Sequence, residues 1–343
     1  MTTPGPIFIL GIMPRSGTNW LRDLLLCHPD CYAAKVHEDF LLANSHLLMR
    51  FGASLYRTWP EKWRAQEQVG PQERLQALLG DALLGFIGQE QEARPGDGDP
   101  SSRPGRRLVT KTPSTTNLEF CFNFFPRSQL IILVRDGRAV VESIVRGFSW
   151  DYETAIRRWD SAAREILRFL AGSGTDRRRT ILVRYEDLYS APRTELERVL
   201  AFLNLDPASY DFGRALGIPI RGSSITGDEP VTTGPDSSPL HRADSWDHWR
   251  HERFNRVAGE SLKALGYQPM ANGKRSPFTS VAHWFHDARW SAPRKLLSVG
   301  FLLKRALGRS DPDFKDARSV YYVRERQAVV RPPEQGAPRA TPE

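Results

Sequence analysis

The feature that most constrains the fold is a strand, a turn and a helix in direct succession near the start of the 343-residue chain. Residues 7–10 are apolar, a turn runs from Gly11 to Gly17, and a helical pattern begins at Trp20. The first N–H groups of a helix and its dipole together bind anions. Gly17 allows close approach of the backbone, and Arg15 adds a cation with several donors. This anion loop (residues 11–17) therefore predicts a site for a phosphate-like ligand. The alternative is an ordinary turn between a strand and a helix.

The anion loop differs from the loop of P-loop enzymes that use ATP and magnesium. Their pattern has four residues between two glycines, followed by Lys and then Ser or Thr. Here five residues separate Gly11 from Gly17, and Thr18 stands in the place of the lysine. A phosphotransferase or kinase using ATP and magnesium is therefore the alternative function and not the preferred one.

Short apolar segments at 31–36, 108–110, 130–134 and 180–183 alternate with segments of helical periodicity, which include the apolar series of residues 75–86. This alternation predicts an α/β domain of P-loop type with three layers: a central parallel sheet flanked by helices, plus a C-terminal helical extension. Ligands bind beyond the carboxyl ends of such strands. We therefore expect the polar residues at the strand ends to converge with the anion loop: His37, Glu38, Lys111, Arg135 and Tyr185.

Composition divides the chain into a domain and a tail. We expect a domain over residues 1–270 with a mobile loop at 89–107, a basic and aromatic extension at 271–326, and a disordered tail at 327–343. The net charge is +8, and residues 274–310 hold eight Lys or Arg and one Asp, so 8 − 1 = +7 of it is local. So local an excess argues against a nucleic-acid partner.

Residues 293–309 have the pattern of an amphipathic helix, which would either dock on protein or make a peripheral contact with an anionic membrane. The chain has no run of about 18 apolar residues and no signal-peptide pattern at its start. Its three cysteines are too few for a disulfide framework. We therefore expect a cytoplasmic protein, with peripheral membrane contact and homodimer formation left open. Its histidines lack the spacing of a metal site, so we expect no metal.

Two motifs resemble the cofactor sites of sulfotransferases that use 3′-phosphoadenosine 5′-phosphosulfate (PAPS). Residues 14–21, Pro-Arg-Ser-Gly-Thr-Asn-Trp-Leu, resemble the 5′-phosphosulfate loop of that family. Arg135 at a strand end and Ser143 on the next helix resemble its 3′-phosphate site. Three further elements follow in the family's order: His28-Pro29, Lys111-Thr112-Pro113 and residues 184–188. The similarity covers residues 6–267 and is closest to the branch with tyrosylprotein, carbohydrate and bacterial sulfotransferases.

The resemblance implies transfer of the sulfuryl group of PAPS to a hydroxyl or amine, leaving 3′-phosphoadenosine 5′-phosphate (PAP). The chemistry of the residues agrees, because a guanidinium and a hydroxyl suit a 3′-phosphate as the anion loop suits a phosphosulfate. The acceptor is a small molecule, a carbohydrate or a peptide, and the sequence does not choose among them. The implied cofactor-binding residues are Arg15, Ser16, Gly17, Thr18, Asn19, Trp20, Arg135, Ser143, Tyr185, Arg221, Gly222 and Ser223.

Sulfuryl transfer resembles phosphoryl transfer, in which positioning and charge stabilisation dominate an in-line displacement. The leaving group requires a cation, for which Arg15 and Lys111 are the candidates. The attacking hydroxyl requires a general base. The resemblance implies a glutamate soon after the second strand, where Glu38 stands, and the adjacent His37 is the second candidate.

Overall fold

The computed structural model describes residues 5–65, 70–88, 105–172, 175–220, 240, 242–270 and 281–290. The chain divides into two compact units, residues 1–273 and 274–343. In the second unit the described residues, 281–290, form a helix. Across the described residues, every helix is too short or too polar to cross a membrane.

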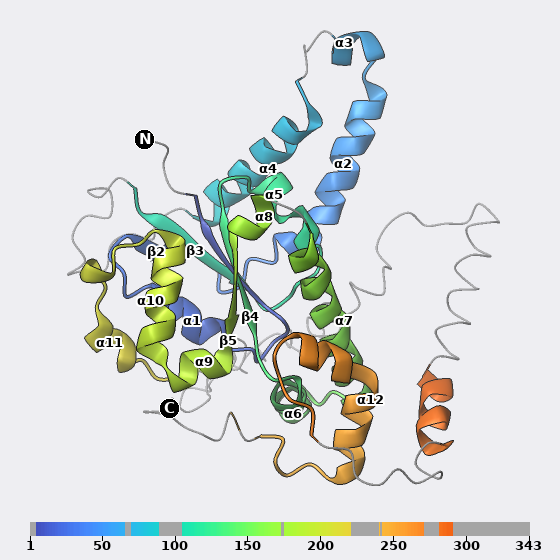
Figure 1. Ribbon diagram of the computed structural model, residues 1–343. Coiled ribbons are helices and arrows are strands. Elements are labelled where there is room, and N and C mark those ends of the chain that lie inside the picture. The colour runs from blue at the N-terminus through green and yellow to red at the C-terminus, as the bar shows by residue number, and fades with distance from the viewer. Residues whose placement is uncertain are drawn as a thin grey trace, which may run out of the picture. The chain divides into compact units, whose positions relative to one another are not determined.

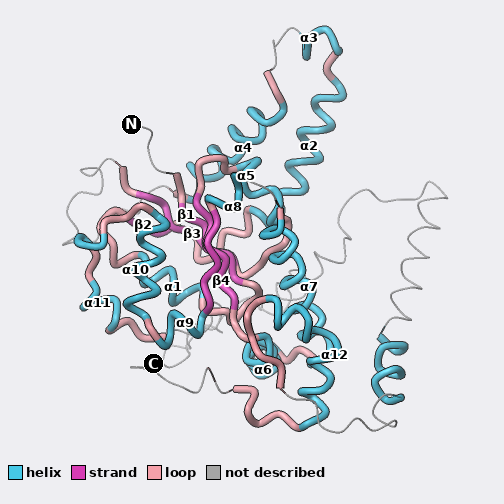
Figure 2. Tube along the Cα trace, in the orientation of Figure 1, coloured by secondary structure: helices cyan, strands magenta, loops and turns pink. Residues whose placement is uncertain are grey.

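The first unit is built on a parallel sheet (Figure 2). Within the described residues the sheet has five strands in the order β2-β3-β1-β4-β5. Their bounds are β1 Ile7–Gly11, β2 Cys31–Ala33, β3 Arg107–Thr112, β4 Gln129–Val134 and β5 Thr180–Arg184. β1 lies in the centre of the sheet, so the anion loop that follows it is flanked by the ends of β3 and β4.

Helices cover both faces of this sheet (Figure 1). Ile7 and Ile9 pack on one face with α1 (Thr18–Leu25), α9 (Tyr185–Ser190) and α10 (Pro192–Leu203). Phe8 and Leu10 pack on the other with α5 (Cys121–Phe124), α6 (Gly137–Phe148), α7 (Tyr152–Ala171) and α12 (His248–Ala264). Successive residues of a strand point to opposite faces, so β1 separates two apolar cores. The predicted three-layer α/β fold is confirmed.

The remaining described elements are short or lie around this centre. They are η1 (Leu42–Asn44), α2 (Ser45–Thr58), α3 (Glu61–Ala65), α4 (Gln72–Ile87), η3 (Leu118–Phe120), α8 (Thr175–Arg178), η4 (Pro207–Ser209) and α11 (Phe212–Leu216). In Figure 1, α2 and α4 run side by side away from the sheet, with α3 at their far end.

Several predicted element ends are wrong, each for a tertiary reason. β2 ends at Ala33 rather than at residue 36. β3 continues through Lys111 to Thr112, because these residues pair with Ile9 and Leu10 of β1. Lys111 therefore lies inside a strand and not beyond its end. Tyr185 begins the helix α9, which the sequence pattern did not predict.

The helix α4 is present, but its apolar series does not all face the core. A Cβ added at Gly80 would lie 1.8 Å from the carbonyl oxygen of Phe124, so α4 packs on α5 at this glycine. Gly80 and Ile87 are buried, whereas Leu78 and Phe86 are 57% and 74% exposed. Close backbone approach at a glycine, rather than the largest apolar side chains, sets the buried face.

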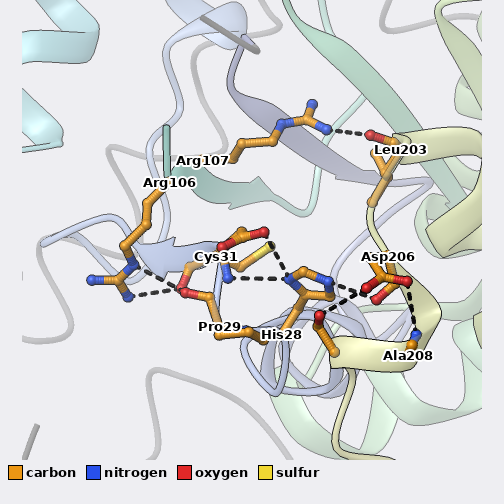
Figure 3. Close-up of polar contacts among 10 residues, drawn as sticks. His28, Pro29, Cys31, Arg106, Arg107, Leu203, Asp206 and Ala208 are labelled. Carbon is orange, nitrogen blue, oxygen red and sulfur yellow. Dashed lines mark hydrogen bonds and ion pairs between the residues drawn. The ribbon is translucent and has the colours of Figure 1, made fainter. Parts of the chain in front are cut away.

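The His28-Pro29 element lies at the amino ends of β2 and β3, where Figure 3 shows a set of side-chain to backbone contacts. His28 is buried; its Nδ1 accepts from the Asp30 N–H at 3.1 Å, and its Nε2 lies 3.1 Å from the Asp206 carbonyl oxygen. Because Nδ1 accepts, the ring proton is on Nε2 and is donated to Asp206. The Arg107 guanidinium donates to the Leu203 carbonyl oxygen at 2.6 Å. This element is therefore structural. It lies at the amino ends of the strands, whereas the anion loop lies at their carboxyl ends.

Some predicted segments fall outside the described residues. These are most of the mobile loop at 89–107, the amphipathic segment 293–309 and the tail 327–343. At the end of the first segment, Arg107 belongs to β3. The predicted division at residues 270, 271 and 327 stays a prediction.

Candidate active site

The anion loop joins β1 to α1 through two residues in the left-handed backbone region. Arg15 has φ 70° and Gly17 has φ 96°. Ser16 fixes the turn, since its Oγ accepts from the Met13 N–H at 3.1 Å and donates to the Met13 carbonyl oxygen. Gly17 is the N-cap of α1 and has no side chain with which to accept from the first N–H groups of that helix. A Cβ at Gly17 would lie 2.6 Å from Cδ2 of Tyr185, so this position requires glycine for both its backbone angle and its contact.

Two arginines donate to Ser143 on α6, and a third is hydrogen-bonded to one of them. Arg15 Nε donates to Ser143 Oγ at 3.0 Å, and Arg242 donates to the same oxygen at 2.7 Å. Arg135 donates to the backbone oxygen of Arg15 at 2.8 Å. Arginine stays charged in proteins, so two like charges meet at one neutral hydroxyl and a third interacts with both of them. This Ser143 cluster (Arg15, Arg135, Ser143 and Arg242) has the composition of a site for a multiply charged anion.

Arg135 packs on an aromatic ring. Its guanidinium carbon lies 4.4 Å from the centre of the Tyr185 ring. The Trp20 ring in turn packs edge-on against the Tyr185 ring, with 5.5 Å between the two centres. Burial lowers the pKa of Arg135, as do the charges of Arg242 and Arg15, whereas Tyr185 and Glu186 oppose the shift. An anion bound in the cluster would offset both the cost of burying the Arg135 charge and its repulsion by the other two arginines. Trp20 packs on Tyr185, which lies against Gly17 of the anion loop, and the predicted role of both residues as cofactor contacts stays a prediction.

A second group of charges lies on β3 and after β2. Lys111 Nζ and Glu38 Oε1 are 3.1 Å apart. The side chain of Lys111 is 1% exposed and that of Glu38 is 16% exposed. Burial lowers the pKa of Lys111, and the Glu38 carboxylate limits that decrease. His37 is exposed. Of the two predicted candidate bases, Glu38 is therefore the one that the structure brings to Lys111.

The segment that carries Glu38 is fastened to β3 by its neighbour Asp39. Asp39 accepts from Thr110 Oγ1 at 2.7 Å and from the Leu41 N–H at 2.8 Å. Its own N–H donates to the Lys111 carbonyl oxygen at 3.1 Å. Burial raises the pKa of Asp39, against the opposing effect of these hydrogen bonds. Sequence reasoning missed Asp39, because a carboxylate beside Glu38 reads as one more exposed acid.

Sequence reasoning also missed Arg242. It stands at the end of an irregular stretch with no motif around it, and the only signal was its charge. The predicted residues Arg221, Gly222 and Ser223 lie outside the described residues, so their role stays a prediction. Thr18 is buried and Asn19 is half-buried at the start of α1.

These two groups of charge suit two different tasks. The Ser143 cluster gathers cations without a carboxylate among its four members. The Glu38–Lys111 pair sets a carboxylate, which accepts protons, beside a buried ammonium, which stabilises developing negative charge. Both lie at the carboxyl ends of the strands that flank the anion loop, on β3 and just beyond β4. Of the five residues predicted to converge with the anion loop, Arg135 and Tyr185 contact it at Arg15 and Gly17, and Glu38 pairs with Lys111 on the strand beside β1. The fifth, His37, is exposed.

Comparison with known proteins finds a family model and several relatives that are all named as sulfotransferases. A model described as the sulfotransferase family matches residues 6–209. The protein-tyrosine sulfotransferase of Drosophila melanogaster is 28% identical over 211 residues, which cover 58% of this chain and 38% of that relative. Protein-tyrosine sulfotransferase 2 of Gallus gallus is 27% identical over 208 residues, covering 58% of this chain and 51% of the relative. The match thus spans about half or less of these relatives' own length.

Among solved structures, the sulfotransferase domain from the Synechococcus PCC 7002 olefin synthase superposes with a TM-score of 0.45 at 25% identity, covering 72% of this chain and 90% of that one. The family match begins just before β1 and ends with η4, so it takes in the anion loop, Glu38, Lys111, Arg135 and Ser143. Because it also takes in more than half of the residues, the chain belongs to the sulfotransferase family, as the motifs in its sequence predicted.

Proposed function

We propose that this protein is a PAPS-dependent sulfotransferase that moves a sulfuryl group to a hydroxyl or amine acceptor. The observation that carries the proposal is the placement of the Ser143 cluster beside the anion loop. PAPS bears a phosphosulfate at one end and a 3′-phosphate at the other, so it needs two anion sites. The anion loop suits the first, and Arg135, Ser143 and Arg242 suit the second.

The chemical step is an in-line displacement at sulfur. A bond forms between the acceptor oxygen or nitrogen and sulfur, and the bond between sulfur and the bridging phosphate oxygen breaks. Glu38 receives the acceptor's proton. PAP leaves with the additional negative charge, which the Lys111 ammonium and the N–H groups of the anion loop stabilise. The 3.1 Å ion pair with Lys111 orients the Glu38 carboxylate for this role.

The names of the relatives suggest the first acceptor to test. Both are called protein-tyrosine sulfotransferases, so the phenolic hydroxyl of a tyrosine peptide comes before a carbohydrate or a small molecule. The alternative of a kinase using ATP and magnesium is not favoured, because Thr18 replaces the lysine of that loop. Cytoplasmic location, membrane contact and oligomeric state stay predictions.

Calorimetry tests the proposed cofactor. The wild-type chain should bind PAP without magnesium, and more tightly than AMP or ATP. Transfer of label from sulfur-35 PAPS to a tyrosine peptide, with carbohydrate and phenolic small molecules in parallel, then tests the reaction. Magnesium-dependent binding of ATP, with no preference for a 3′-phosphate, would contradict the proposal.

A further inference from the structure

Two consecutive residues of α6 hold a segment that lies about a hundred residues later in the chain. Ser143 Oγ accepts from Arg242 at 2.7 Å. Glu142 Oε2 accepts from Trp246 Nε1 at 2.6 Å. The 242–246 turn, closed by a 3.0 Å hydrogen bond from the Trp246 N–H to the Ala243 carbonyl oxygen, is thus attached to α6 at both ends.

Glu142 is the stronger of these two attachments. It is buried, and besides Trp246 it accepts from the Tyr152 hydroxyl at 2.7 Å and from Arg146 Nε. Burial alone raises the pKa of Glu142, but the hydrogen bonds from Tyr152, Trp246 and Arg146 outweigh it, so the pKa is lowered. Glu142 is therefore an ionised carboxylate, and hydrogen bonds to an ionised acceptor are stronger than those between neutral groups.

Trp246 is also fixed by packing. Its ring lies 5.8 Å from Tyr152, 5.4 Å from His251 and 6.0 Å from Phe254, centre to centre. The next residue, Asp247, caps α12 by accepting from the Arg250 N–H at 2.8 Å. The turn therefore has a rigid base on the α12 side, whereas residues 243–245 themselves form no regular element.

Arg242 needs such support for two reasons. A long, flexible side chain on an irregular backbone loses entropy when it is held against a ligand, and a pre-ordered backbone reduces that loss. Its position also brings its charge to Arg15 and Arg135, which repel it until an anion is bound. The hydrogen bond from the Trp246 indole N–H to Glu142 fixes the 242–246 turn beside α6. A turn fixed there holds Arg242 near Ser143 and so opposes that repulsion.

We propose that Glu142 and Trp246 are positioning residues that hold Arg242 at Ser143 and thereby set the preference for a nucleotide with a 3′-phosphate over one without. This inference rests on the proposed function, because the 3′-phosphate is the group that the Ser143 cluster would bind. It assigns part of the selectivity to the segment beyond residue 209, where the family match ends.

The test compares the affinities of PAP and AMP by calorimetry in single variants of the full chain. Trp246→Phe keeps a large aromatic ring but removes the N–H donor, and Glu142→Gln removes the carboxylate charge. Each should weaken PAP about tenfold or more and leave AMP within about twofold, as expected for loss of a hydrogen bond to a charged group. Trp249→Phe, the same substitution three residues along the chain, is the matched control and should change neither affinity.

A double-variant cycle distinguishes positioning from a general loss of structure. Arg242→Ala should itself lower PAP affinity, and adding Trp246→Phe to it should lower that affinity little further, because the two act through one contact. Equal weakening of PAP and AMP, or additive losses in the double variant, would overturn the inference. If Trp246→Phe does not fold, hydrogen exchange on the wild type decides the matter. PAP should then slow exchange of the amides at 243–247 while AMP leaves them unchanged, and equal protection by both would overturn it.

The outcomes separate this inference from the proposed function. If the wild type shows no preference for PAP over AMP, the proposed function fails. If the wild type prefers PAP and the Trp246→Phe and Glu142→Gln variants keep that preference in full, only the positioning role fails.

Discussion

Replacing Glu38 by glutamine separates the two roles that the structure gives its carboxylate. Glutamine keeps the size of the side chain and an oxygen that accepts from Lys111, but it is a far weaker base. Loss of a general base costs about 10² to 10⁴ in rate, or about 2.7 to 5.4 kcal/mol of transition-state stabilisation. We expect Glu38→Gln to lower single-turnover rates by this factor and to leave PAP affinity nearly unchanged, because the Ser143 cluster is on other elements.

The variant should also change the pH dependence of the residual rate. Burial lowers the pKa of Lys111, and the charge and hydrogen bond of Glu38 raise it again. Without the carboxylate the pKa of Lys111 falls further, so the ammonium loses its proton at a lower pH. The alkaline limb of the residual activity should therefore move to lower pH in Glu38→Gln, whereas it should stay in place in His37→Ala, whose side chain is exposed.

The assay is rapid-quench transfer from labelled PAPS, at saturating concentration, to an acceptor confirmed with the wild type. His37→Ala is the matched control, because it changes the adjacent residue on the same segment. Normal turnover in Glu38→Gln together with an inactive His37→Ala variant would refute the assignment and make His37 the base. An unchanged alkaline limb would refute the coupling between Glu38 and Lys111.

Three further predictions follow from single contacts. Arg135→Ala should weaken PAP by about 1.5–3 kcal/mol and AMP by less, measured by calorimetry, and an equal loss for both ligands would mean that Arg135 acts through the fold. Gly17→Ala should lower the free energy of unfolding by at least about 1 kcal/mol in denaturant titrations, since φ 96° and a Cβ 2.6 Å from Tyr185 are both unfavourable. Glu153→Gln should destabilise the fold by about 3 kcal/mol at pH 7, because buried Arg253 donates to both carboxylate oxygens at 2.6 and 2.8 Å. Burial alone raises the pKa of Glu153, but its hydrogen bonds, led by that from Arg253, lower the pKa overall. The difference in stability between the wild type and Glu153→Gln is therefore full above about pH 4.5. It should shrink as the pH falls through the lowered pKa of Glu153.

The sequence predicted the fold because its strongest signals are local. A run of apolar residues indicates a buried strand, as in β1 and β4, and the glycines of the anion loop indicate a turn. Both signals can be read from residues that are adjacent in the chain. The ends of elements were less predictable. β3 extends to Thr112 because β1 pairs with it, and the buried face of α4 follows the contact of Gly80 with Phe124. Neither partner is adjacent in sequence.

The same division holds for the candidate site. Arg15, Glu38, Lys111 and Arg135 were found because each lies near the carboxyl end of a strand or in the segment after it, and parallel strands bring their carboxyl ends to one edge of the sheet. Ser143, in the middle of α6, was found through the resemblance to the 3′-phosphate site of sulfotransferases.

Which of these residues contact one another was decided only by the tertiary structure. The sequence assigned Arg15 to the leaving group and to cofactor binding, but its hydrogen bond to Ser143 on α6 is a contact that only the fold showed. Arg242 and Trp246 join the site from a segment with no motif, through hydrogen bonds that span about a hundred residues. A hydrogen bond of this kind depends on where two side-chain atoms lie in space to within a few tenths of an ångström, and only the packing of α6 and α12 on the sheet fixes those positions.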